Sequence, residues 1–185
     1  MLLERIGFVG IFNFIAEHRV IYDAPAIIIT GKPDTGETML ADWFIRQWGF
    51  DDKVDKVGVF RPNGIFRVNT ADDEQCLEVL NHIIDLASSG LKRSAVENNK
   101  NEVFIFDNYD CMSSDCMGAY KLAYDAVARA YERGEKNIKI ILISSKEKGE
   151  LPIEKQGDWD SVLGRGVRIE TPDRLSDIEK VNDVN

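Results

Sequence analysis

The sequence has few of the residues on which most metal sites and histidine-dependent enzymes rely. It contains only two histidines, His18 and His82, and its three cysteines, Cys76, Cys111 and Cys116, lack the spacing of zinc ligands. Histidine-based hydrolysis and a cysteine-rich metal centre are therefore poorly supported. An odd number of cysteines without a secretory signal is typical of the reducing cytosol, so we expect a cytoplasmic protein.

Long apolar runs and an excess of basic residues are also missing. The apolar stretch 6–16 is too short to cross a bilayer, so we expect a packed helix there and no membrane anchor. The 23 lysines and arginines are outnumbered by 32 aspartates and glutamates, which gives a net charge of −9. Such an acidic chain does not suit the coating of DNA or RNA, and we expect no direct nucleic-acid binding.

The sequence does contain enough apolar residues for one substantial core. They make up 44% of 185 residues, and no repeat or low-complexity tract interrupts them. We expect a single domain, 1–185, with an N-terminal helix in 1–22, an αβ core in 23–172 and a short tail in 173–185.

Apolar runs alternate with amphipathic segments along this core. Such an alternation predicts an α/β fold, in which helices cover both faces of a buried parallel sheet. Pro62-Asn63-Gly64 is typical of a hairpin turn between two of the strands. The expected strands are Ala26–Thr30, Val57–Phe60, Ile65–Val68, Val103–Phe106, Ile138–Ile143 and Val167–Glu170, and the expected helices are Leu2–His18, Thr38–Trp48, Asp73–Ser89 and Met117–Arg133.

The most specific motif is a glycine loop directly after the strand that ends at Thr30. Its glycines and its final hydroxyl have the spacing of a phosphate-binding loop, G-x-x-x-x-G-K-[ST], but Glu37 stands where the pattern has lysine. In that pattern, backbone N–H groups cradle phosphates and the hydroxyl binds Mg²⁺. The candidate cofactor-binding residues are Gly31, Lys32, Pro33, Asp34, Thr35, Gly36, Glu37, Thr38 and Met39.

Two later strands end in polar residues that belong at the same edge of the sheet. Phe104-Ile105-Phe106-Asp107-Asn108 has the form of a Walker B element, in which an aspartate holds Mg²⁺, so Thr38 and Asp107 are the candidate metal ligands. Asp107 and Asn108 are the candidate catalytic residues, although an amide can only orient water and Asp110 is a possible substitute base. Ser144 is a candidate sensor of the γ-phosphate. The alternative is that these residues only cap strands and turn the chain.

Together these motifs resemble the core of the AAA+ ATPases, and within them the bacterial replication initiators with their regulatory homologues and helicase loaders. The segments Glu150-Leu151-Pro152 and Asp158 to Arg165 add to a resemblance that spans about residues 13–181. It implies a three-layer α/β/α P-loop fold, bound ATP or ADP with Mg²⁺, and homo-oligomers in which an arginine enters the neighbour's site. Arg165 or Val162 occupies that position, depending on the alignment. The helical lid that normally follows this core is expected to be absent.

Glu37 determines the expected function. A carboxylate about 4 Å from a phosphate oxygen opposes it by about 4 kcal/mol at an effective dielectric constant of 20. Even a severalfold smaller penalty lowers affinity more than tenfold. We therefore expect a degenerate nucleotide-binding domain, or pseudo-ATPase, that acts through a protein partner in DNA replication or its regulation. The alternative is an active Mg²⁺-dependent ATPase in which Lys32 or a partner's arginine compensates.

Overall fold

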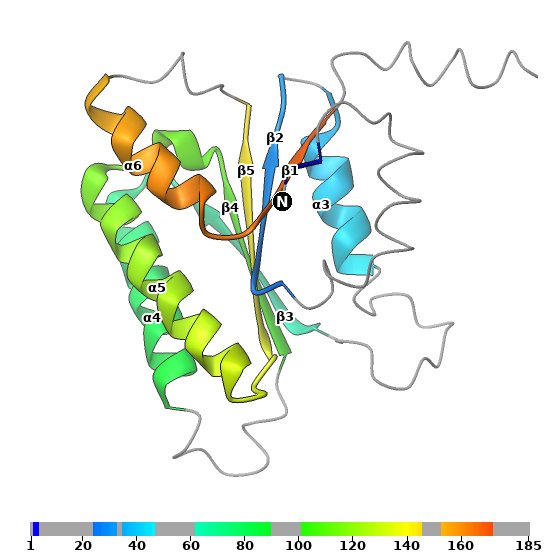
Figure 1. Cartoon of the computed structure of the whole chain (residues 1–185), viewed down its shortest axis with the longest axis vertical. Coiled ribbons are helices and arrows are strands. Elements are labelled where there is room, and N and C mark those ends of the chain that lie inside the picture. The colour runs from blue at the N-terminus through cyan, green and yellow to red at the C-terminus, as the bar shows by residue number, and fades with distance from the viewer. Residues whose placement is uncertain are drawn as a thin grey trace, which may run out of the picture.

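A parallel sheet lies at the centre of the chain (Figure 1). The computed structural model describes residues 2–3, 24–32, 35–46, 62–89, 101–145 and 153–171. Within them six strands follow the order β1-β6-β2-β5-β4-β3, and every neighbouring pair is parallel. The strands are β1 (Leu2–Leu3), β2 (Ala26–Thr30), β3 (Pro62–Asn69), β4 (Asn101–Asp107), β5 (Ile138–Ser144) and β6 (Val167–Glu170).

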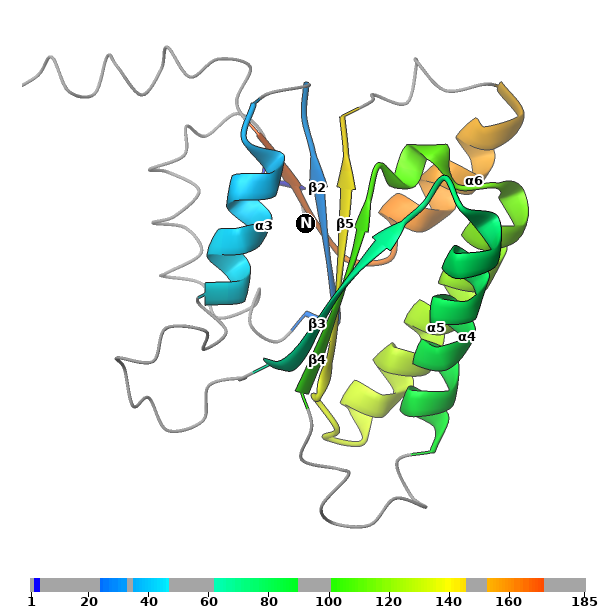
Figure 2. The ribbon, with the colours of Figure 1, turned by 180° about the vertical axis from the view of Figure 1, so that it is seen from behind.

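Helices cover both faces of this sheet. Helix α3 (Glu37–Ile45) lies on one face, and α4 (Asp73–Ser88), α5 (Ser114–Glu132) and α6 (Ile153–Leu163) lie on the other, as Figures 1 and 2 show from opposite sides. A short 3-10 helix, η2 (Tyr109–Cys111), connects β4 to α5. The expected three-layer α/β/α fold with a central parallel sheet is thus confirmed.

The central strands β2 and β5 are buried on both faces because most of their side chains are apolar; the buried Lys139 of β5 donates a hydrogen bond to the Ala24 carbonyl oxygen at 2.8 Å. All residues of β2 and β5 are buried, and their side chains alternate between two cores. Ile27 and Ile29 belong to the core that includes Phe44 of α3, whereas Ile28 belongs to the core that includes Tyr120 of α5. This alternation decides which face each strand-end residue occupies.

Local signals explain where the helices begin and end. At the start of α4, the Asp72 carboxylate accepts a hydrogen bond from the Gln75 N–H at 3.1 Å. At the start of α5, the Ser113 hydroxyl accepts one from the Cys116 N–H at 3.2 Å, so this helix begins three residues before the expected Met117. Gly134 follows α5 with a φ of +86°, a conformation that ends a helix.

Two expected elements were wrong in the described residues, and the short helix η2 and helix α6 were missed. Leu2–Leu3 pair with β6 as a strand, although the sequence predicted that a helix begins there. Pro62 to Gly64 lie within β3, with a register shift, and do not form a hairpin turn. Proline is tolerated there because β3 is the last strand of the described sheet, where an N–H on the outer side needs no ladder partner. Helix α6 was missed because its few apolar residues give no clear helical period.

Several expectations fall outside the described residues. These are most of the N-terminal helix, the strand Val57–Phe60, the loop residues Pro33 and Asp34, the segment Glu150-Leu151-Pro152, and the tail 173–185. Among the residues that are described, none of the helices has both the length and the apolar character needed to cross a membrane.

Candidate nucleotide-binding site

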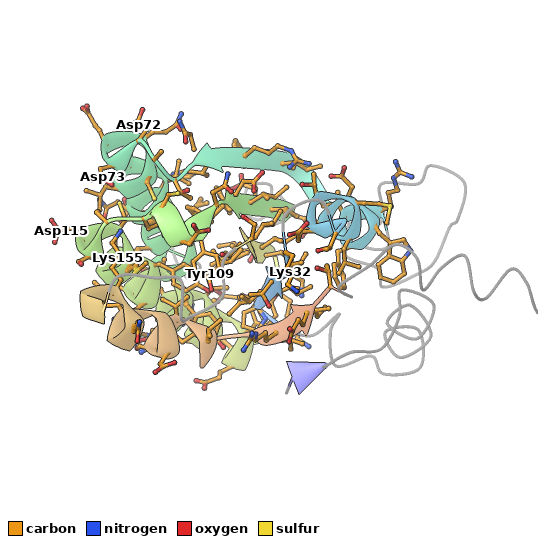
Figure 3. All side chains as sticks on the ribbon, turned by 90° about the horizontal axis from the view of Figure 1, so that it is seen from above. Lys32, Asp72, Asp73, Tyr109, Asp115 and Lys155 are labelled. Atoms are coloured by element: carbon orange, nitrogen blue, oxygen red, sulfur yellow. The ribbon has the colours of Figure 1, made fainter. Side chains whose placement is uncertain are left out.

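The candidate loop and the acidic strand end at the same edge of the sheet. Thr30 at the end of β2 is in register with Ser144 on β5 and Glu170 on β6, and Asp107 on β4 is in register with Ile143. Figure 3 looks onto this edge, with Lys32 of the loop near its middle. In open parallel sheets, the edge formed by the carboxyl ends of the strands is where ligands bind.

Hydrogen bonds tie the loop after β2 to the neighbouring strands. The Gly31 N–H donates to the Ser144 carbonyl oxygen at 3.1 Å. The N–H and the hydroxyl of Thr35 both donate to the Lys32 carbonyl oxygen, at 3.2 and 2.7 Å. Thr35 Oγ1 also shares a 2.6 Å hydrogen bond with Oγ1 of Thr171, the residue after β6. The loop is therefore anchored to both strands that flank β2.

Both glycines of the motif are required by the geometry of the loop. Gly36 has a φ of +96°, a left-handed conformation in which other residues are strained. At Gly31 an added Cβ would lie only 1.7 Å from Thr171 Oγ1 and 2.7 Å from Thr35 Oγ1. The first glycine is thus explained by close packing against Thr171, whether or not a phosphate binds.

Helix α3 points its amino end at this loop. The first N–H groups of an α-helix have no intrahelical acceptor, and Gly36 at the N-cap provides no side-chain cap. The helix dipole adds positive potential at the same end, so this turn favours an anion. Thr38 and Met39 in this turn are exposed, which leaves the Thr38 hydroxyl within reach of solvent and of a bound ion.

Glu37 lies in the same turn but is turned into the protein. Its exposed fraction is only 7%. An acid in the first turn of a helix is stabilised by the dipole, which explains why a carboxylate is tolerated here in the absence of phosphate. In the phosphate-loop motif this position is a lysine that contacts the phosphates, so here a carboxyl group stands in place of a cationic group.

Asp107 lies on the α3 face of the sheet. Val103 and Ile105 pack in the core that includes α3, and alternation along β4 places Asp107 on the same side. The buried hydroxyl of Thr70 donates to the carbonyl oxygens of both Asp107 and Asn108 at 2.7 Å. The Thr70 hydroxyl therefore fixes the chain direction directly after the candidate metal ligand.

Asn108 turns the chain out of β4. It is exposed and has a φ of 55° and a ψ of 45°, a left-handed conformation that asparagine tolerates better than most residues. The Cys111 N–H donates to its carbonyl oxygen at 2.8 Å and so closes the first turn of η2. The left-handed backbone conformation is therefore enough to explain why this residue is an asparagine.

Ser144 and Asp110 form a buried pair on the opposite face of the sheet. The Ser144 hydroxyl donates to Asp110 Oδ1 at 2.8 Å, and both residues are buried. Ser144 is on the α5 side because Ile140 and Leu142, four and two residues earlier, pack in that core. The structure does not bring Ser144 onto the α3 face with Asp107, and the Asp110 carboxylate is engaged inside the protein.

Arg165 lies at the other edge of the sheet, before β6 begins. Its Nε donates to Asp125 Oδ1 on α5 at 3.2 Å, and its Nη1 donates to the carbonyl oxygen and the hydroxyl of Ser161 at 2.7 and 2.8 Å. Within one chain Arg165 therefore connects the end of α6 to α5, away from the loop. Val162, the alternative in the second alignment, is buried in the core.

Three residues of this region were missed by sequence reasoning. Thr70 forms a hydrogen bond with the end of the acidic strand β4, and Thr171 forms one with Thr35 of the loop. On the α5 side of the sheet, Arg168 Nε donates to Thr30 Oγ1 at 3.3 Å. Burial raises the pKa of the Tyr109 hydroxyl above its ordinary value, and the nearby positive charge of Arg168 lowers it in part. Both threonines directly follow a strand, but this position alone is too common to identify them from the sequence.

Three solved structures have a similar chain path over part of their length. Cdc6p from Pyrobaculum aerophilum matches 86% of this chain at 12% identity with a TM-score of 0.48. The RuvB Holliday junction branch migration motor of Thermotoga maritima matches 89% at 13% identity with a TM-score of 0.46, and PCH-2 of C. elegans matches 96% at 15% identity with a TM-score of 0.48.

The present chain spans less than half the length of each of these proteins: 43% of Cdc6p, 45% of RuvB and 46% of PCH-2. No protein-family model matches the sequence, and no curated protein is significantly similar to it. At 12–15% identity the likeness to the solved structures concerns the chain path and assigns no role to any residue.

The contact between Gly31 and Thr171 predicts that Gly31→Ala destabilises the protein. The new methyl group overlaps a hydroxyl, so we expect a loss of about 1–3 kcal/mol in the free energy of unfolding, measured by urea denaturation. Thr171→Ala in the same chain should restore part of it. Gly118→Ala in α5 is the matched control, because nothing lies within 4 Å of its added Cβ. A Gly31→Ala chain as stable as the Gly118→Ala chain would contradict this packing.

The paired hydrogen bonds of Thr70 predict a second loss of stability. Thr70→Val keeps the shape of the side chain but leaves two carbonyl oxygens without their donor, so we expect it to cost about 1–3 kcal/mol. Thr70→Ser keeps the hydroxyl and should cost less. If the serine variant loses as much stability as the valine variant in the same denaturation experiment, the hydroxyl does not hold the turn after Asp107.

Proposed function

We propose that this chain is a degenerate AAA+-like nucleotide-binding domain, a pseudo-ATPase that binds ATP or ADP weakly and acts through contacts with a protein partner in DNA replication or its regulation. The observation that supports this most directly is the buried Glu37 in the first turn of α3. Glu37 places a carboxylate in the helix turn whose N–H groups would otherwise favour a phosphate.

The donor groups around the loop fit a nucleotide in part. The amino end of α3 supplies N–H groups for phosphate oxygens, and the exposed Thr38 hydroxyl and the Asp107 carboxylate are oxygen ligands of the kind that Mg²⁺ prefers. Glu37 does not fit, because its charge repels the phosphates that these groups attract. Weak binding that depends on Mg²⁺ follows from this combination.

Hydrolysis is expected to be slow for a separate reason. A water molecule attacking a phosphate is helped by a general base, and neither candidate after β4 provides one at the surface. Asn108 has no basic group, and the Asp110 carboxylate accepts the Ser144 hydroxyl in the protein interior. We expect a turnover number far below about 1 per second, the lower end of ordinary enzyme rates.

The role through protein contacts rests on charge and on the motifs. A net charge of −9 favours a protein partner over a nucleic-acid backbone. The replication setting comes from the resemblance of the glycine loop and the acidic strand to replication initiators and helicase loaders. In a homo-oligomer, Arg165 would have to leave Asp125 before it could reach a neighbouring copy.

Glu37 variants test the proposal through nucleotide affinity. Titration calorimetry with ATP and with ADP, each with and without Mg²⁺, should show weak binding to the unaltered chain. Glu37→Lys should bind at least tenfold more tightly, since it replaces repulsion by attraction. Glu37→Gln is the matched control, because it removes the charge without adding one, and its affinity should lie between the other two.

The proposal fails if the unaltered chain binds ATP tightly and Glu37→Lys brings no improvement. The same preparations should be assayed for phosphate release. The alternative is an active ATPase in which Lys32 takes the role of the motif lysine. It would be favoured if the unaltered chain hydrolyses ATP at an ordinary rate and Lys32→Ala abolishes that hydrolysis.

A further inference from the structure

Two fully buried thiols meet where α4 and α5 begin. Cys76 and Cys116 each have an exposed fraction of 0% and belong to the same core cluster, and the Cys116 thiol is one of the neighbours that raise the pKa of Cys76. Cys116 is in the first turn of α5, three residues after its N-cap Ser113, and Cys76 is four residues after the α4 N-cap Asp72. The third cysteine, Cys111, is exposed.

The contacts of Asp73 place the Cys116 sulfur against the start of α4. Cys116 Sγ lies 3.5 Å from Asp73 Oδ1 and 3.8 Å from the Asp73 carbonyl oxygen. Asp73 and Cys76 are three residues apart on α4, so they share one face of that helix. The Cys116 sulfur therefore lies against the face of α4 that carries Cys76.

We propose that Cys76 and Cys116 form an oxidation site, at which a peroxide converts the two thiols into a disulfide that links α4 to α5. One thiol sulfur attacks the O–O bond, an S–O bond forms, and the thiol proton leaves with the displaced oxygen as water. The second thiol then attacks this sulfenic sulfur, the S–S bond forms and a second water leaves. Two electrons pass from the two sulfurs to the peroxide.

The surroundings of the pair set how readily it reacts. Burial, together with the neighbouring Cys116 thiol, raises the pKa of Cys76 to about 12, so thiolate is scarce at neutral pH. The exposed Cys111 should therefore react with peroxide first. The pair nevertheless lies in the opening turns of two helices, and such ends open locally at a lower cost than helix centres. A slow reaction that leaves the fold intact is the expected behaviour.

A disulfide at this place would close a loop that contains β4, η2 and the turn at Asn108. Cross-links of this kind stabilise a protein mainly by restricting its unfolded chain. Oxidation should therefore raise the melting temperature, and reduction should reverse the rise. The bond would also hold the chain segment after Asp107 against α4.

The test uses the full chain with Cys111→Ser, in which only the pair remains. After treatment with hydrogen peroxide, remaining thiols are blocked with N-ethylmaleimide in denaturant and the chain is digested with trypsin. Mass spectrometry should find peptides 68–92 and 101–121 joined, with the loss of two hydrogens, and the oxidised chain should melt at a higher temperature. The double variant Cys111→Ser, Cys116→Ser is the matched control and should show neither change.

Two results would overturn the inference. One is that both cysteines remain blocked by N-ethylmaleimide after a peroxide treatment that fully oxidises Cys111 in the unaltered chain, even when dilute urea is present to promote local opening. The other is that each sulfur is found as a separate sulfinic acid without a cross-link. A joined peptide that a reductant separates, with the melting temperature returning to its starting value, supports it.

Discussion

The structure depends on the parallel pairing of β2 with β5 on one side and β6 on the other. Because all five residues of β2 are buried between its neighbours, its register is fixed, and Thr30 ends level with Ser144 and Glu170. The hydrogen bonds from the Gly31 N–H to Ser144 and from the Thr171 N–H to Thr30 continue that register beyond the strands. The loop, the start of α3 and the end of β4 are all positioned by this arrangement.

The shape of the candidate site and its charge are determined by different residues. Gly31 and Gly36 keep the loop in place through packing and a left-handed turn, and neither requirement involves a phosphate. The charge is set by Glu37, which the helix dipole stabilises when no anion is present. The shape of the loop therefore does not require a lysine at position 37, and under the proposed function the electrostatic interaction between position 37 and a phosphate would determine nucleotide affinity.

Much of the fold was predictable from the sequence because its central strands are largely apolar runs. Ile138 to Ile143 is unambiguous as a buried strand, and Gly134 marks the end of the helix before it. The turn predicted at Pro62 to Gly64 was wrong because a local signal cannot tell a hairpin from an edge strand with a shifted register. Helix α6 has too few apolar residues for its period to be read.

The candidate site was predictable in its location and not in its contacts. Asp107 and the glycine loop were identified because their residue types and spacing carry the motif. The pairing of Ser144 with Asp110, and of Arg165 with Asp125, joins residues 34 and 40 positions apart, which no local pattern encodes. Thr70 and Thr171 had no motif to mark them, since a threonine after a strand is common.

Hydrogen exchange of the full chain, measured with and without excess ADP and Mg²⁺, tests most directly whether the loop is the nucleotide site. The account predicts slower exchange in residues 31–40 and at the end of β4, with a larger effect in the Glu37→Lys chain than in the unaltered one, because binding lowers the population of open states. Protection at another surface, or none in either chain, would contradict it.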